Sequence, residues 1–223
     1  MNDNKRPVLV LDLDGTLVNT KPDLVAALNV AIESVGLAPV PDELIGHGVG
    51  QGVRAMLAKS FSHYDEPLSD ELQDELFVKF INYYSNNIAN FSKPYSGVQA
   101  ALRTFSNSGW HLAVCTNKPE NMAKSLLNAL DMDDQFAAIC GLDTFPVSKP
   151  HADHILKTIS MAGGRVEGSV MVGDTATDVD AAKNSGIPSI VVDFGYSPTP
   201  VQSLGASKII SNFDQLWDAV EQI

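Results

Sequence analysis

Two aspartates separated by one residue, Asp12 and Asp14, are the most chemically suggestive feature of the sequence. They follow the apolar run at residues 7–11, which has the composition of a buried strand in a parallel sheet. At about 5 Å, two carboxylates repel each other by about 1 kcal/mol in water and by several times more in a partly dry site. A divalent cation would remove that cost. The alternative is an acidic turn in solvent.

A second acidic pair, Asp174 and Asp178, follows another apolar run and opens a predicted helix. Capping of that helix by Asp174 or Thr175 is the alternative interpretation. Carboxyl ends of parallel strands meet at one edge of a sheet, where such folds place their ligands. The two acidic pairs together could therefore supply the oxygen ligands that Mg²⁺ prefers.

Polar residues follow two further segments of the chain. Thr116 and Asn117 come after the apolar run at 111–115, and Lys149 lies in the sequence Ser148-Lys149-Pro150. A hydroxyl, an amide and nearby backbone N–H groups can hold phosphate oxygens, and a lysine offers a point charge to an anion. Taken singly, these residues fit an ordinary turn with a helix cap and a surface lysine better than a site.

The elements that must position these residues alternate between strand and helix. We predict strands at 7–11, 111–115, 169–172, 189–192 and 208–210, and helices at 97–106, 120–130, 152–161, 177–185 and 213–220. Such alternation predicts an α/β fold, a Rossmann-like parallel sheet with helices on both faces.

One stretch interrupts the alternation. Residues 18–91 carry helical patterns, at 22–35, within 41–60 and at 69–88, and we expect no strand there. The sequence therefore predicts a sheet-containing core formed by 1–17 and 92–223, with a mostly helical insertion at 18–91 after the first strand.

The composition limits the possible partners and location. The 223 residues carry a net charge of −12, which disfavours nucleic acid as a partner. No apolar run approaches the roughly 20 residues of a membrane span, and the polar N-terminus does not resemble a signal peptide. Two cysteines cannot form a disulfide framework. We expect a cytoplasmic protein, a monomer or a weak homodimer.

The segments DLDGTLV, TNK, SKP and GDTATD, in this order, resemble the haloacid dehalogenase superfamily of phosphohydrolases. The second aspartate of DLDG is typical of its phosphatase branch. Within the superfamily, DLDGTLVNTKPDLVAALNVAIESVGL and ELIGHGVGQGVRAML resemble phosphoglycolate phosphatases. The chain departs from the family pattern K-P-x-P, because Ala152 stands where the second proline would be. Thr175 also replaces the more usual serine of GD-S.

The resemblance implies a role for each motif residue. Asp12 would be the nucleophile that forms an aspartyl-phosphate, and Asp14 would protonate the leaving alcohol and then activate water. Thr116 and Lys149 would bind the phosphoryl group, with Asn117 nearby. Gly15, in the same motif as the two aspartates, is also expected at the substrate.

The resemblance also implies a Mg²⁺ site. Asp174 would ligate the ion together with the Asp12 side chain and the Asp14 main-chain carbonyl. Asp178 would support the metal shell or Lys149.

The helical insertion at 18–91 resembles the small α-helical cap domain of this superfamily, which implies that 1–17 and 92–223 form the catalytic core. A helical cap can exclude water and contact the leaving group of the substrate. The glycine-rich patch at 46–54 is the expected substrate-facing segment, with His47 and Arg54 as candidate contacts. The alternative is a helix–helix turn with Arg54 on a solvated face.

These observations predict a Mg²⁺-dependent phosphatase for a small phosphorylated metabolite, with 2-phosphoglycolate as the leading substrate. Two alternatives stay open: a phosphosugar mutase resembling β-phosphoglucomutase on the same scaffold, and a binding or regulatory module without catalysis. His151 and His154 are expected on the surface, and Trp110 and Trp217 in core or rim space.

Overall fold

The structure is a computed structural model that describes residues 5–41, 44 and 52–223. Contacts within the chain divide it into two compact units. One unit comprises Met1–Asn19 and Lys93–Ile223, and the other comprises Thr20–Ser92. Each unit is described by itself.

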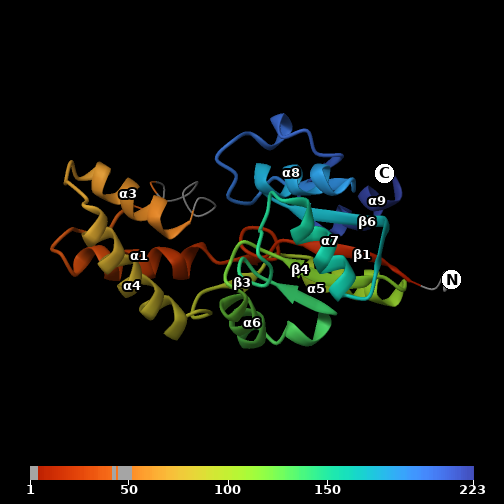
Figure 1. Ribbon diagram of the computed structural model, residues 1–223, viewed down its shortest axis with the longest axis horizontal. Helices are drawn as coiled ribbons and strands as arrows, with labels where there is room; N and C mark the ends of the chain where they lie inside the picture. Colours follow the sequence, from red (N-terminus) through yellow and green to blue (C-terminus); the bar gives the residue numbers. More distant parts are fainter. Residues whose placement is uncertain (1–4, 42–43, 45–51) are drawn as a thin grey trace. The chain divides into compact units, whose positions relative to one another are not determined.

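Six parallel strands form the sheet of the first unit, in the order β5-β4-β1-β6-β7-β8 (Figure 1). In β1, Val8 and Val10 point to one face while Leu9 and Leu11 point to the other, and all four are fully buried. The central strand is therefore covered on both faces, as a parallel sheet requires. The strands are β1 (Pro7–Leu11), β4 (His111–Cys115), β5 (Ala138–Cys140), β6 (Arg165–Gly173), β7 (Ser189–Val192) and β8 (Lys208–Ile210).

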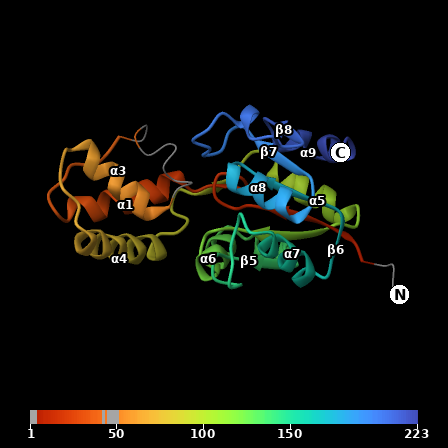
Figure 2. The ribbon, with the colours of Figure 1, turned by 45° about the horizontal axis from the view of Figure 1, so that its top comes forward.

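Helices cover the sheet (Figure 2). Helices α7 and α8 pack together on the face that carries Val8 and Val10, where Ile155, Ile159 and Ala181 join the same apolar core. Helix α5 packs on β4 and against α9. The predicted Rossmann-like α/β fold is thereby confirmed. The helices are α5 (Val98–Asn107), α6 (Glu120–Ala129), α7 (Ala152–Met161), α8 (Ala176–Ser185) and α9 (Leu216–Glu221).

Short strands are where the structure differs from the sequence prediction. Strand β5 is a three-residue edge strand that was not predicted. The expectation of no strand in 18–91 is wrong at β2 (Val18–Asn19), which pairs antiparallel with β3 (Lys93–Pro94). Segments of two or three residues show no hydrophobic period, and among them only β8 was predicted, from its short apolar run.

In the second unit the described residues form helices joined by loops, with α1 (Lys21–Glu33), α3 (Val53–His63) and α4 (Asp70–Asn86). Helix α1 packs on both of the others, and its core includes Leu28, Ile32, Phe80 and Tyr84. Part of the segment predicted at 41–60 lies outside the described residues. In the part of the chain that is described, no helix has the length and apolar character needed to cross a bilayer.

Asp23 links the beginning of the second unit to its end. Its carboxylate, only 2% exposed, accepts hydrogen bonds from the backbone N–H of Phe91 and of Ser92, at 3.1 and 2.8 Å. The Ser92 hydroxyl donates a third bond at 2.6 Å. A buried carboxylate with three donors is a strong local anchor, because each donor would otherwise be left unsatisfied.

Replacing Asp23 by alanine should lower the free energy of unfolding by about 3 kcal/mol, because buried donors lose a charged acceptor. Urea denaturation followed by circular dichroism measures this change. Asp74→Ala, an exposed aspartate of the same unit, is the matched control and should change the stability by less than about 1 kcal/mol. Equal stability of the two variants would contradict the anchoring role.

Candidate active site

The side chains singled out in the sequence lie at the carboxyl edge of the sheet. Asp12 directly follows β1, Thr116 follows β4 and Asp174 follows β6. Because β1 is hydrogen-bonded to both β4 and β6, the three segments end side by side. This edge is where open α/β sheets bind their ligands.

Lys149 occupies the middle of this edge. Its Nζ lies 2.9 Å from Asp12 Oδ1 and 2.6 Å from Asp178 Oδ1, and the residue is only 4% exposed. Burial by itself favours the neutral amine, yet the charges of Asp12 and Asp178 raise the pKa of Lys149 above its usual value. The ammonium therefore stays charged while it is withdrawn from water.

Backbone and side-chain hydrogen bonds hold the Lys149 segment in place. Asn117 Nδ2 donates to the Lys149 carbonyl at 2.9 Å, and the Lys149 N–H donates to Asn117 Oδ1 at 3.1 Å and to His154 Nδ1 at 2.9 Å. Asn117, which directly follows Thr116, thus connects the end of β4 to the Lys149 loop. The amide fixes the backbone that carries the ammonium.

His154 is fully buried, so the expectation of a surface position is wrong for it. Burial and the nearby Lys149 charge lower its pKa to about 4, so the imidazole is neutral at ordinary pH and can accept the hydrogen bond from the Lys149 N–H. His154 stands between Asp153 and Ile155, so the sequence pattern of α7 did not show whether its side chain faces the core or solvent. His151 is exposed as expected, and its Nδ1 accepts from the Asp153 N–H.

Asp174 and Asp178 are held by donors from several segments. Asp174, 1% exposed, accepts from the Thr16 hydroxyl at 3.2 Å and from the Tyr196 N–H at 2.6 Å. Asp178 Oδ2 accepts from the Thr175 N–H and hydroxyl at 3.0 and 2.8 Å, while its Oδ1 accepts from Lys149. Asp178 therefore both caps α8 and orients the lysine, so the capping interpretation and a role in the site hold together.

The carboxylates of Asp12, Asp174 and Asp178 fit a divalent cation. One oxygen of each lies within 4.8 Å of the others. Asp12 Oδ1 is buried and, although it is close to Lys149, has no aligned hydrogen-bond donor. Asp178 Oδ1 is paired with the Lys149 ammonium, whereas the oxygens of Asp174 accept from neutral donors, which makes Asp174 a better candidate ligand than Asp178.

The electrostatics of the cluster support the same fit. Burial, opposed by Lys149 and aided by the charges of Asp178 and Asp14, raises the pKa of Asp12 to about 6. Burial, aided by Asp178 and Asp12, raises the pKa of Asp174 well above its usual value. Removal from water, together with the neighbouring carboxylates, thus disfavours the charged form of both groups, and a bound cation would stabilise that form.

Asp14 lies apart from this cluster. Its carboxylate oxygens are 3.0 and 3.3 Å from Nζ of Lys118, a residue that is largely buried. No role was predicted for Lys118. Its position directly after Thr116 and Asn117 could have indicated a second positively charged side chain at the site. Asp14 thereby has its own charged partner, separate from that of Asp12.

Gly15 allows the backbone to approach Asp174 closely. Its φ is +82°, and a Cβ there would lie 2.5 Å from Asp174 Oδ2 and 2.7 Å from Tyr196 Cδ2. Only glycine fits both the conformation and the space. Thr116 is buried, and its Oγ1 accepts from the Lys118 N–H at 3.2 Å. The substrate contacts expected of Gly15 and Thr116 stay predictions.

The two expected cap contacts differ in how much the structure says of them. His47 lies outside the described residues. Arg54 is half-exposed on α3, with Nη1 2.6 Å from Asp74 Oδ1 and 3.4 Å from Gln73 Oε1, and its guanidinium lies over the Phe77 ring. The guanidinium is thus engaged within its own unit, and its contact with substrate stays a prediction.

Comparison with known proteins places the chain in a family. Residues 9–192 match the model of the haloacid dehalogenase-like hydrolases. A phosphoglycolate phosphatase of Agrobacterium fabrum is 44% identical over 96% of this chain and 92% of its own length, and one of Mesorhizobium japonicum is 41% identical over 95% and 93%. The crystal structure of a predicted phosphoglycolate phosphatase from Haemophilus somnus has a TM-score of 0.88 at 26% identity, covering 97% of this chain and 99% of that one. The chain belongs to the haloacid dehalogenase-like hydrolases and is similar over nearly its whole length to members named phosphoglycolate phosphatase.

Proposed function

We propose that the chain is a Mg²⁺-dependent phosphatase that hydrolyses a small phosphate monoester, 2-phosphoglycolate, through an aspartyl-phosphate on Asp12. The observation that carries this proposal is the buried Lys149 ammonium 2.9 Å from the Asp12 carboxylate, beside Asp174 and Asp178. A carboxylate and a phosphate dianion repel each other, so attack requires positive charge at this place. The names of the curated relatives support the choice of substrate.

In the first step, a carboxylate oxygen of Asp12 attacks phosphorus and the bond from phosphorus to the alkoxide oxygen breaks. Asp14, in its protonated form, gives a proton to the departing alkoxide, which leaves as glycolate in the case of 2-phosphoglycolate. Lys149 and Thr116 hold the phosphoryl oxygens. Nucleophilic catalysis divides one very slow hydrolysis into two faster steps.

In the second step, water attacks the phosphorus of the aspartyl-phosphate and gives a proton to the Asp14 carboxylate. The bond between phosphorus and the Asp12 oxygen breaks, which releases phosphate and restores both aspartates. Lys118, 3.0 Å from Asp14 Oδ1, orients that carboxylate for both proton transfers. Asp14 therefore acts as acid and then as base from one position.

The charges at the site require a cation besides Lys149. Three carboxylates and one ammonium leave an excess of two negative charges before any phosphate arrives. Mg²⁺ held by Asp12 and Asp174, with the Asp14 carbonyl, would neutralise that excess and the charge of the phosphoryl group. Asp178 would keep Lys149 in position.

We also propose that the helical unit acts as the cap predicted at 18–91, covering the site during turnover and selecting the leaving group. Its support is the placement of the insertion, which follows the strand and loop that carry Asp12 and Asp14. Excluding water strengthens the electrostatic contacts on which phosphoryl transfer depends. His47 and Arg54 are the candidate contacts within it.

The remaining expectations about partners and location stay predictions. A small phosphorylated metabolite is the expected partner, and the net charge of −12 disfavours nucleic acid. A monomer or weak homodimer in the cytoplasm is the expected state.

Replacing Asp12 by asparagine should lower phosphate release from 2-phosphoglycolate by at least about a thousandfold, because the amide cannot act as the nucleophile. A colorimetric phosphate assay with purified protein and Mg²⁺ measures the rate. Asp180→Asn, an exposed aspartate on α8, is the matched control and should keep the parent rate.

Three results of this assay would contradict the proposal. Undiminished turnover by the Asp12→Asn variant would require another nucleophile. Absence of phosphate release from a broad panel of phosphate esters would favour a binding module instead. Formation of an isomerised sugar phosphate without release of phosphate would favour the mutase.

Removing divalent metal should abolish turnover, since two excess negative charges would then oppose the substrate. Dialysis against EDTA followed by the phosphate assay tests this expectation. Addition of Mg²⁺ in excess of the chelator should restore the rate, and full activity in EDTA would exclude a dependence on metal.

Replacing Lys149 by methionine should abolish turnover and lower the free energy of unfolding of the metal-free protein by about 3 kcal/mol, because Asp12 and Asp178 lose their buried partner. Mg²⁺ should raise the melting temperature of this variant more than that of the parent protein. Lys157→Met removes an exposed ion pair on α7 and serves as the control, with little change in either measurement. A Lys149→Met variant as stable as this control would show that the buried ion pairs do not anchor the site.

A further inference from the structure

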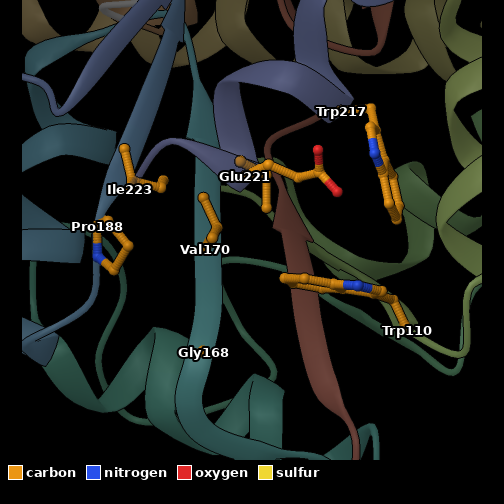
Figure 3. Close-up of a pocket in the computed structure, with 8 residues that line it drawn as sticks. Trp110, Gly168, Val170, Pro188, Trp217, Glu221 and Ile223 are labelled. Carbon is orange, nitrogen blue, oxygen red and sulfur yellow. The ribbon is translucent and has the colours of Figure 1, made fainter.

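A second cavity opens at the edge of the sheet opposite to the carboxylates. It has a volume of about 390 Å³ and lies beside the amino ends of β4 and β7 and the middle of β6 (Figure 3). Trp110 precedes β4, Gly168 and Val170 belong to β6, and Pro188 precedes β7, while α9 and the residues after it supply Trp217, Val220, Glu221 and Ile223. Val170 and Asp174 are four residues apart on one extended segment, about 13 Å, so this cavity is distinct from the proposed active site.

Two indole rings form walls of this cavity. Figure 3 shows both rings nearly edge-on, one upright and one lying crosswise, so that their faces border a common corner. Phe105, fully buried on α5, contacts both, with ring centroids 5.3 Å from Trp110 and 5.1 Å from Trp217. The aromatic walls are therefore held from behind by the core, which keeps their faces available to a ligand.

Glu221 supplies the charge of the cavity. It lies four residues after Trp217 on α9, so the two side chains share a helix face, and its carboxylate points toward the indole rings (Figure 3). Among the described residues, Glu221 makes no ion pair and no side-chain hydrogen bond, and the cavity lining contains no lysine, arginine or histidine. The corner thus combines electron-rich ring faces with an uncompensated negative charge.

We propose that this cavity is a binding site for a small organic cation with an alkylated ammonium head group. The faces of tryptophan rings attract cations, most strongly when the cation is weakly hydrated, and alkylated ammonium ions are the ligands that aromatic cages bind. Glu221 adds a Coulombic attraction, and the apolar contacts of Val170, Pro188 and Ile223 suit the alkyl groups of such an ion.

Charge distinguishes this ligand from others that an aromatic cavity could accept. A neutral aromatic or aliphatic ligand would gain the apolar contacts but no Coulombic attraction to Glu221. An anion would be repelled by Glu221 and by the net charge of −12. The same net charge attracts cations to the protein from solution.

The chain offers a direct readout of this site, because its only two tryptophans both line the cavity. Titration with choline, with ionic strength held constant by NaCl, should change the intrinsic tryptophan fluorescence in a saturable manner. The probe for comparison is 3,3-dimethylbutan-1-ol, the neutral isostere of choline, which should bind at least about tenfold more weakly.

The matched variants are Glu221→Gln and Asp218→Asn, each of which removes one negative charge from α9. Glu221 lines the cavity and Asp218 does not. Glu221→Gln should weaken the binding of choline about fivefold, and Asp218→Asn should leave it unchanged. The absence of a saturable signal, equal binding of the neutral isostere, or equal binding to both variants would each overturn the proposal. Phosphate release is not part of the readout, so the result does not depend on the proposed activity.

Discussion

The mutual repulsion of carboxylates gathered at one end of the sheet is the constraint on which the rest of the site depends. Asp12, Asp174 and Asp178 are brought within 4.8 Å of one another by a sheet whose strands end at a common edge. Burial strengthens that repulsion, and burial first, with the neighbouring carboxylates second, raises the pKa values of Asp12 and Asp174. Lys149 offsets only part of the charge, and the proposed Mg²⁺ would offset the rest.

The backbone around the carboxylates is shaped to keep them in place. Gly15 and Gly195 both lie so close to Asp174 that a Cβ at either position would come within 2.5 Å of its side chain. Asp178 satisfies the first turn of α8 with one oxygen and Lys149 with the other. Residues that look like ordinary turn and capping residues thus also determine where the charged groups sit.

The sequence predicted the parts of this structure that leave a periodic or compositional signal. The apolar runs at β1, β4, β7 and β8 and the helical pattern at α7 have the predicted bounds. Strand β6 begins four residues before the predicted start. The prediction missed this part because Arg165 and Glu167 are polar and exposed, so the segment lacks an apolar run. At the site, the spacing of acidic residues at strand ends was enough to select Asp12, Asp174 and Asp178. The contacts of Lys118 and His154 depend on which way side chains turn in the folded core, which no local pattern encodes.

The two-residue pairing of β2 with β3 has a consequence for how this fold can diversify. Val18 lies opposite Pro94 and Asn19 opposite Lys93, so the polypeptide leaves the core and rejoins it at hydrogen-bonded neighbours. Pairing of β2 with β3 brings the two ends of the inserted segment together, so the entropic cost of closing that segment is met within the core. We therefore expect that insertions of other lengths and shapes can join the core at this junction while the core strands stay unchanged. Substrate specificity could then change by replacement of the insertion alone, with the hydrolase core retained.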